Sequence, residues 1–157
     1  MITAQYDDII MDAARTYNVP FDWIKAVIGT ESNFDPRAYR AEPKIQDASY
    51  GLMQILYSTA KSIGYQGEPE GLFDPKTNIM LGTKYLAKLI ERHGMDFKSI
   101  YSAYNSGSPT RYLTSAQVGR NVERAVEWLT KVSSGSGGAA TGIAFLVGAA
   151  LYLLLRK

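Results

Sequence analysis

The sequence predicts a mainly α-helical domain followed by one transmembrane helix. Apolar residues recur at helical spacing in several segments, helix-starting and helix-ending residues flank them, and no stretch alternates well enough for a long strand. The chain has 157 residues, enough for a single core. We expect the domain over residues 1–132, a Gly/Ser linker over 133–138, the transmembrane helix over 139–155 and a basic end at 156–157.

The first helix is expected over residues 3–17, and the second from Pro20 to about Glu31. One face of the second helix follows the i, i+3, i+4, i+7 spacing and consists of Ile24, Val27, Ile28 and Glu31. This spacing directs Glu31 inward, with no Lys or Arg on the same face. Burial raises the pKa of a carboxyl group, which suits a general acid near neutral pH. The alternative is a carboxylate that reaches solvent or caps backbone.

Residues 35–49 are expected to form a long polar loop, and residues 59–63 a short helix that Gly64 ends. Asp74 is a suitable N-cap, with Pro75 at the first position of a helix that Gly94 stops.

Asp96 should cap the next helix, which ends between Asn105 and Gly107, and a last helix is expected over about residues 116–131.

Four short segments occur in a specific order, namely Glu31–Pro36, Gly51–Gln54, Leu72–Pro75 and Ala103–Gly107. In this order they resemble the soluble lytic transglycosylases and their goose-type lysozyme relatives, and the resemblance covers about residues 8–130. It implies a lysozyme-like lobe around one deep groove, with peptidoglycan glycan strands as the substrate.

The resemblance also implies a reaction in which Glu31 is the sole acid and base. Most glycosidases use two carboxylates, but one suffices when the substrate's own N-acetyl group attacks the anomeric carbon. The bond broken is MurNAc-β-1,4-GlcNAc, and the product is 1,6-anhydro-MurNAc. The other nearby acids, Asp35, Glu42 and Asp47, are expected at the helix exit or in solvated loop positions. Two alternatives are a goose-type lysozyme that uses water and a catalytically inactive wall-binding membrane protein.

Six further residues are expected to support Glu31 in binding substrate: Ser32, Gly51, Met53, Gln54, Tyr104 and Asn105. The sequence departs from the family at one place, because Val122 occupies the position where many relatives carry a tyrosine near the acid. Either Tyr112 or Tyr101 replaces that tyrosine, or the active site relies less on such a residue; the sequence does not decide among these.

The uncharged run over residues 139–155 approaches the roughly 20 residues that cross a bilayer core. Arg156 and Lys157 would anchor its end on the cytoplasmic or equivalent side. Small residues recur every four positions, at Ala140, Ala144 and Gly148, so self-association or docking to a membrane protein is a further prediction.

Composition and charge narrow the possible ligands of the protein. The net charge of +2 comes from Arg156 and Lys157, so the rest is balanced and nothing favours nucleic acid. The chain has no cysteine, and His93 lies near a helix end without a ligand cluster, so we expect no metal and no cofactor.

The first 12 residues lack the basic start of a secretory signal. We therefore expect a phage-encoded virion protein or one associated with a secretion or injection machine, in a virion membrane or host envelope.

Overall fold

The computed structural model describes residues 3–135, and these residues are mainly α-helical, as predicted. Six helices form, α1 (Asp7–Tyr17), α2 (Phe21–Ser32), α3 (Tyr57–Ser62), α4 (Pro75–His93), α5 (Phe97–Ser106) and α6 (Ala116–Gly135). Three short strands form one antiparallel sheet in the order β1 (Tyr39–Glu42), β2 (Asp47–Tyr50), β3 (Ile55–Leu56). Single 3-10 turns link the elements, η1 (Pro43–Ile45), η2 (Pro69–Phe73) and η3 (Arg111–Leu113).

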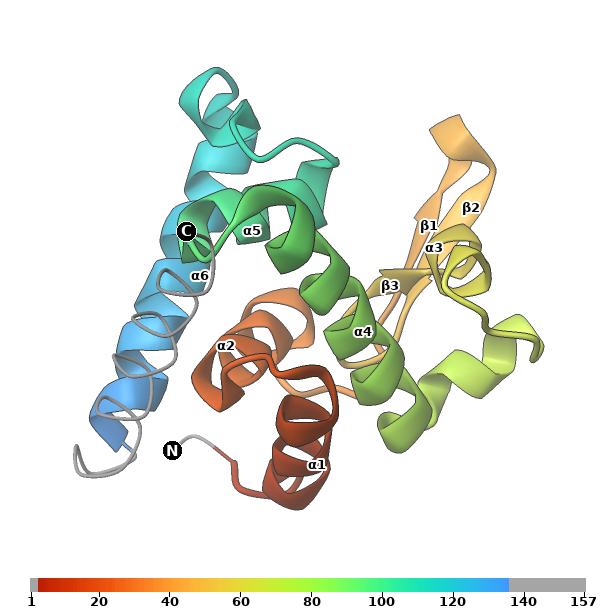
Figure 1. Cartoon of the computed structure of the whole chain (residues 1–157). Coiled ribbons are helices and arrows are strands. Elements are labelled where there is room, and N and C mark those ends of the chain that lie inside the picture. The colour runs from red at the N-terminus through yellow and green to blue at the C-terminus, as the bar shows by residue number, and fades with distance from the viewer. Residues whose placement is uncertain (1–2, 136–157) are drawn as a thin grey trace, which may run out of the picture.

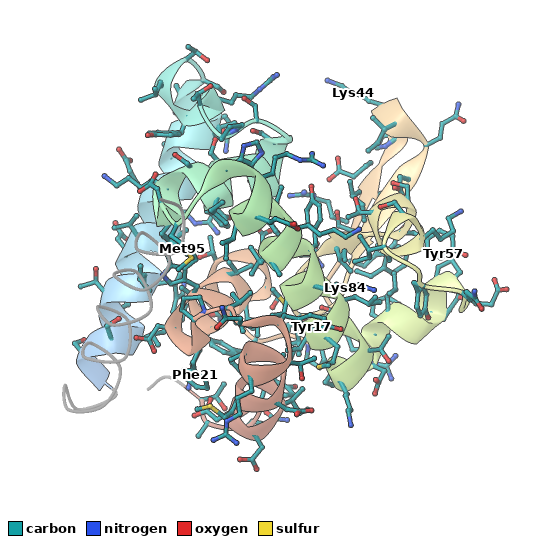
Figure 2. The ribbon with its side chains drawn as sticks, viewed as in Figure 1. Tyr17, Phe21, Lys44, Tyr57, Lys84 and Met95 are labelled. Carbon is teal, nitrogen blue, oxygen red and sulfur yellow. The ribbon has the colours of Figure 1, made fainter. Side chains whose placement is uncertain are left out.

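Helix α4 crosses the middle of the molecule, with α6 along one edge and the hairpin of β1 and β2 at the opposite edge (Figure 1). Helix α2 packs most extensively against α6, α1 packs against α4, and α5 packs against both α4 and α6. Figure 2 marks Lys44 at the outer tip of the hairpin. The candidate site residues described below therefore lie between the helical bundle and the small sheet.

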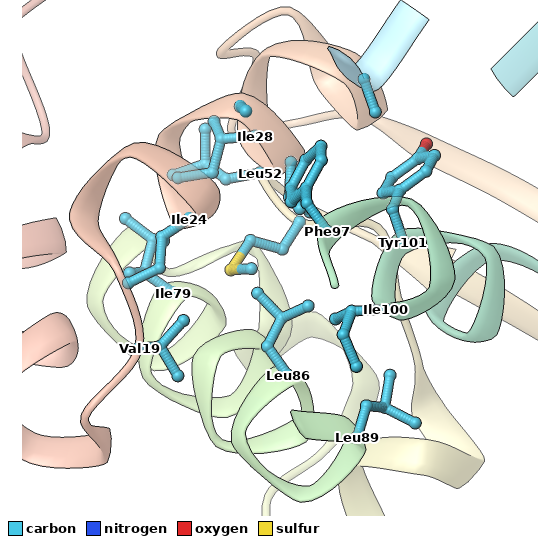
Figure 3. Close-up of a cluster of buried hydrophobic side chains, with 14 of the residues drawn as sticks. Val19, Ile24, Ile28, Leu52, Ile79, Leu86, Leu89, Phe97, Ile100 and Tyr101 are labelled. Carbon is cyan, nitrogen blue, oxygen red and sulfur yellow. The ribbon is translucent and has the colours of Figure 1, made fainter. Parts of the chain in front are cut away.

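Helix α2 is the central element of the core. Residues 24–30 of this helix are all buried, so it is enclosed on several sides rather than along one stripe. Ile24 and Ile28 lie beside Leu86 of α4 and Ile100 of α5 in one aliphatic cluster (Figure 3). Burial of each such side chain contributes about 1.5–3 kcal/mol. Glu31, in the last turn of α2, is thus attached to a helix that the core encloses.

The predicted helix boundaries at α4 and α5 are confirmed. The Oδ1 atom of Asp74 accepts a hydrogen bond from the Thr77 amide at 2.8 Å, and Asp96 caps α5 in the same way through Ser99 at 2.9 Å. Gly94 follows the last residue of α4, as expected. These caps satisfy amide groups that have no partner within a helix, which explains why local sequence located them.

The prediction of a long loop over residues 35–49 was wrong, because β1, η1 and β2 lie within it. The hairpin pairs Tyr39 with Tyr50 and Glu42 with Asp47. Each of these two strands has only four residues, and β1 has no buried residue. Such short, exposed strands lack the alternation that predicts a strand from sequence.

Asn78 of α4 ties the sheet to the helical core. It is fully buried; its Oδ1 accepts from the Met53 amide at 2.8 Å, while its Nδ2 donates to the Tyr50 and Leu72 carbonyls at 2.8 and 2.7 Å. Gly51 has φ +68°, and a Cβ there would lie 2.5 Å from Asn78 Nδ2. The turn after β2 therefore requires glycine for its backbone conformation and for the approach of Asn78.

The prediction that a flexible linker begins at residue 133 was also wrong, since α6 continues to Gly135. Val132 is buried, and Ser133 Oγ donates to Asp22 Oδ2 of α2 at 2.9 Å, so packing holds the end of the helix. The rest of the predicted linker and the predicted transmembrane helix, with Ala140, Ala144 and Gly148, lie outside the described residues. Within residues 3–135, no helix combines the length and apolar character needed to cross a membrane.

Candidate active site

Glu31 lies where α2 ends in a sharp backbone turn. Asn33 and Phe34 both adopt left-handed conformations, with φ of 51° and 67°. Asparagine tolerates this region, whereas an aromatic residue rarely adopts it. The Phe34 ring packs edge-to-face on Trp128 of α6, with ring centroids 5.7 Å apart. Tertiary packing thus stabilises the turn that leaves the Glu31 side chain at a surface opening.

Two hollows meet at Glu31 and together form a groove. The first, called here the arginine hollow, is lined by the end of α2, the loop into β1, and α6, and it includes Arg37, Arg40 and Arg124. The second, called here the tyrosine hollow, lies between the sheet and α4–α5 and includes Tyr85 and Tyr104. Glu31, Arg40 and Gln54 line both hollows.

The Glu31 carboxyl group is partly buried, and loss of solvent raises its pKa above the ordinary glutamate value. A hydrogen bond from the Tyr101 hydroxyl to Oε1, at 2.7 Å, and the positive charges of Arg40 and Arg124 act in the opposite direction. Desolvation dominates, so the protonated form is favoured relative to a solvated glutamate. A partly buried acid with a raised pKa is suited to donate a proton near neutral pH.

Tyr101 is the residue that takes up the contact with the acid. Val122, at the position of the tyrosine found in many relatives, is buried in the core and 2% exposed. Tyr101 reaches Glu31 from α5 instead, and Figure 3 shows it at the edge of the apolar cluster with its hydroxyl directed away from the aliphatic side chains. Tyr112, the other candidate, packs against the core.

The other acids near the groove already have partners. Asp35 Oδ1 accepts the Arg37 amide at 2.8 Å, and Glu42 pairs with Arg40. Asp47 accepts hydrogen bonds from Ala48 and Ser58. Glu31 is therefore the one acid lining both hollows within residues 3–135, and the only groove carboxylate there that is bonded to a tyrosine hydroxyl.

Ser32 and Gln54 lie beside Glu31. The Ser32 Oγ atom is 2.8 Å from the Leu52 carbonyl oxygen, so the hydroxyl braces the end of α2 against the turn after β2. Gln54 has φ 45°, and its Nε2 donates to the Ala38 and Gly51 carbonyls at 3.0 and 3.1 Å. These bonds fix the orientation of the side-chain amide, and the side-chain oxygen Oε1 remains an acceptor beside the groove that Gln54 lines.

Tyr104 and Asn105 lie in the tyrosine hollow, whose lining includes Arg40 but neither Arg37 nor Arg124. The Tyr104 hydroxyl donates to the Met53 carbonyl at 2.7 Å, and its ring packs on Tyr85 with centroids 5.4 Å apart. Asn105 Oδ1 accepts from Asn121 Nδ2 of α6 at 3.1 Å. The two residues thus present a fixed aromatic face and an oriented amide.

Gly51 and Met53, also expected to bind substrate, line neither hollow. Met53 is fully buried in the core, and only its backbone carbonyl is linked to the site, through Tyr104. Gly51 packs against Asn78 and Leu72. Both residues therefore act on the groove through the shape of the turn, and the Met53 side chain lies in the core.

Several groove residues were not predicted from the sequence: Arg37, Arg40, Tyr85, Arg124 and Trp128. These five residues are scattered along the chain, and no local sequence pattern indicates that they line a groove. Exposed arginines and half-buried aromatic residues are common on any protein surface. Within residues 3–135, no group of three or more His, Cys, Asp or Glu side chains is arranged to hold a metal ion.

Known proteins share this sequence pattern and this fold. The membrane-bound lytic murein transglycosylase C of Shigella sonnei (strain Ss046) is 35% identical over 118 residues, which cover 66% of this chain and 32% of that protein. The chain thus spans about a third of that relative's length.

Two solved structures have the same fold. An inactive mutant of the lytic transglycosylase Slt from Pseudomonas aeruginosa superposes with a TM-score of 0.75, at 18% identity, over 85% of this chain and 25% of the other. The 70-kDa soluble lytic transglycosylase Slt70 of Escherichia coli gives a TM-score of 0.74, at 24% identity, over 87% of this chain and 25% of the other.

The family comparison covers the residues that form the groove. Residues 8–138 match the family described as the transglycosylase SLT domain. The matched segment contains the whole groove, from the end of α2 to the Trp128 side of α6. The chain therefore belongs to the transglycosylase SLT domain family.

Proposed function

We propose that this protein is a murein lytic transglycosylase that cleaves the MurNAc-β-1,4-GlcNAc bond of peptidoglycan. The observation that carries the proposal is Glu31, a carboxyl group with raised pKa at the junction of two hollows, hydrogen-bonded to Tyr101. The relatives named above are lytic transglycosylases, and the family match supports the same chemistry here.

In the first step, protonated Glu31 donates its proton to the glycosidic oxygen, and the GlcNAc side leaves. The acetamido oxygen of the muramic sugar attacks its own C1 as that bond breaks, so no second carboxylate is needed. The structure suits this route, because Asp35 and Glu42 are held by Arg37 and Arg40.

In the second step, the Glu31 carboxylate removes the proton from the C6 hydroxyl of the same sugar. The C6 oxygen bonds to C1 and displaces the acetamido oxygen, which gives the 1,6-anhydro product without consuming water. Glu31 returns to its protonated state. The amide of Gln54, which lines both hollows, and the amide of Asn105, which lines the tyrosine hollow, are suited to hydrogen-bond N-acetyl groups.

The test is mass spectrometry of the muropeptides that the full chain releases from purified peptidoglycan, with Glu31→Gln in parallel. Products one water lighter than hydrolysed muropeptides, absent with the mutant, are the expected result. Hydrated reducing ends would identify a goose-type lysozyme instead. Release that is equal for both proteins would overturn the assignment of Glu31, and no release by the folded wild-type chain would favour a wall-binding structural role.

We also propose that residues 139–155 anchor the enzyme in a membrane, as their apolar composition predicts. The Shigella relative is named as membrane-bound. The full chain should float with phospholipid vesicles in a density gradient, whereas a chain ending at Gly135 should not; equal behaviour would contradict the anchor. We further propose that the enzyme reaches the cell wall from a phage virion. Mass spectrometry of purified phage particles tests this proposal. Detection of the protein only in the envelopes of uninfected cells would reject it.

A further inference from the structure

The two hollows beside Glu31 differ in charge. The arginine hollow contains Arg37, Arg40 and Arg124, and its only acids are Glu31 and Asp35. The tyrosine hollow contains Arg40 and Glu42, which pair with each other, and is otherwise lined by neutral side chains apart from Glu31. An anionic part of a substrate would therefore be favoured on one side of the catalytic acid and not on the other.

Arg37 and Arg124 have no carboxylate partner within residues 3–135, where the ion pairs are those of Lys25 with Asp7 and Arg40 with Glu42. Each guanidinium nevertheless has a contact within the protein that positions it. Arg124 donates from Nη2 to the Thr30 carbonyl of α2 at 2.9 Å. Arg37 lies over the Phe73 ring, 5.9 Å from its centroid. A guanidinium carries five N–H donors, so both groups retain donors for a ligand.

The walls of the arginine hollow favour a flat, partly apolar ligand. Tyr39 is 58% exposed and packs edge-to-face on Tyr50, with centroids 5.4 Å apart. Trp128 also lines this hollow, and Gly29 lets it approach α2, since a Cβ at Gly29 would lie 2.5 Å from the indole ring. The hollow thus combines two aromatic side chains with two arginines that form no ion pair within the described part of the chain.

We infer that the arginine hollow binds the carboxylates of the peptide stem of peptidoglycan, through Arg37 and Arg124. This rests on the proposed function, since it assumes a glycan with alternating GlcNAc and peptide-bearing muramic sugars. The lactyl carboxyl group of a stem-bearing muramic sugar is in amide linkage with the peptide and is uncharged, so the free carboxylates of that substrate lie on the peptide. Arginine binds carboxylates through paired N–H donors, and such charge-assisted hydrogen bonds are about twice as strong as neutral ones.

One side of Glu31 is thereby assigned to a stem-bearing muramic sugar. The muramic sugar that carries the bound stem lies on the α2–α6 side of Glu31, and a neutral part of the strand lies against Tyr85, Tyr104 and Asn105. Phosphate groups of other wall polymers share the anionic chemistry, so the test has to separate carboxylate from phosphate.

Binding is measured in the full-length Glu31→Gln protein, so that turnover does not interfere and the result is independent of the proposed reaction. Isothermal titration calorimetry compares three phosphate-free glycan oligomers of equal length: one with peptide stems, one without stems whose lactyl carboxyl groups are amidated, and one with amidated stem carboxylates. We expect the first to bind about 10-fold more tightly than the other two, consistent with charge-assisted hydrogen bonds.

Adding Arg37→Gln should remove most of this preference and leave the affinity for the peptide-free oligomer within about twofold. Arg37→Lys keeps the positive charge but lacks the planar set of N–H donors of a guanidinium. It should therefore restore only part of the preference for the oligomer with peptide stems. Arg15→Gln, on the exposed side of α1, is the matched control and should keep the full preference.

Equal affinity for the three oligomers, or a preference that Arg37→Gln does not change, would overturn the inference while the transglycosylase assignment stands or falls on its own product analysis. Displacement of the oligomer by glycerol phosphate but not by free stem peptide would assign the hollow to phosphate groups and also overturn it.

Discussion

Glu31 in the helical part of the molecule and Asp47 in the sheet are surrounded in opposite ways. Glu31 accepts one hydrogen bond, from Tyr101, and its burial outweighs that bond, so its pKa is raised. Burial also opposes ionisation of Asp47, but hydrogen bonds from Ser58 and Ala48 outweigh it and lower its pKa. The same functional group is therefore kept protonatable in one region and ionised in the other.

The difference shows which carboxylate can do chemistry. Asp47 uses its oxygens to join β2 to the start of α3 through Ser58, so its hydrogen-bonding capacity is spent on structure. Glu31 lies on a rigid buried helix and keeps one oxygen without a described donor. Burial with few donors favours proton transfer, whereas exposure with many donors favours a structural anion.

The largest expected contrast is in activity. Glu31→Gln removes the only proposed proton donor and should lower the rate of muropeptide release by at least about 100-fold, since general acid catalysis contributes about 10²–10⁴-fold. Asp47→Asn should change the rate by less than about twofold, because its hydrogen bonds lie within the sheet and α3. Rates from purified peptidoglycan test both; a comparable loss in the two mutants would break the comparison.

A smaller effect is expected from Tyr101→Phe, which removes the donor to Glu31 and leaves the ring in place. The rate should fall by about 10-fold, the loss of one charge-assisted hydrogen bond. Because that bond lowers the pKa of Glu31, its removal should raise this pKa further and move the alkaline limb of the pH–rate profile to higher pH.

Tyr112→Phe serves as the control for Tyr101→Phe, since Tyr112 packs on the core without contacting Glu31. It should leave the pH profile unchanged. A profile that moves equally in both mutants, or in neither, would show that Tyr101 has only a packing role.

The smallest effects concern the pH dependence of stability, and they should have opposite signs. A carboxyl group with a raised pKa contributes stability below its ordinary pKa and loses it as pH rises through the folded value, so Glu31→Gln should stabilise the fold at neutral pH. Asp47 stabilises the fold at pH values above its ordinary pKa. This stabilisation is lost as the pH falls through the lowered pKa of the folded state.

Asp47→Asn should therefore destabilise the fold at neutral pH, by less than about 1 kcal/mol for a partly exposed group, and this difference should shrink in acid. Urea unfolding at pH 7 and pH 4 measures both mutants. Differences from wild type of the same sign at pH 7 would contradict the contrast between the two regions.

Several features of the fold were predictable because their causes are local. Asp74 and Asp96 cap helices by accepting amides three residues ahead, and Gly94 ends α4 at a position that the chain itself specifies. The hairpin was missed because its four-residue strands depend on Asn78, 28 residues away from the Tyr50 carbonyl it holds. The end of α6 was missed because Ser133 is held by Asp22, 111 residues earlier.

The sequence by itself determined the mainly helical class, the family and the inward placement of Glu31, since helical spacing and short motifs act within a few residues. Only the tertiary structure decided that Tyr101 contacts the acid across 70 positions, that Met53 lies in the core, and that Arg37 and Arg124 line one hollow. Burial and proximity set the pKa of the acid and the charge of the groove, and both depend on residues that meet only when the chain folds.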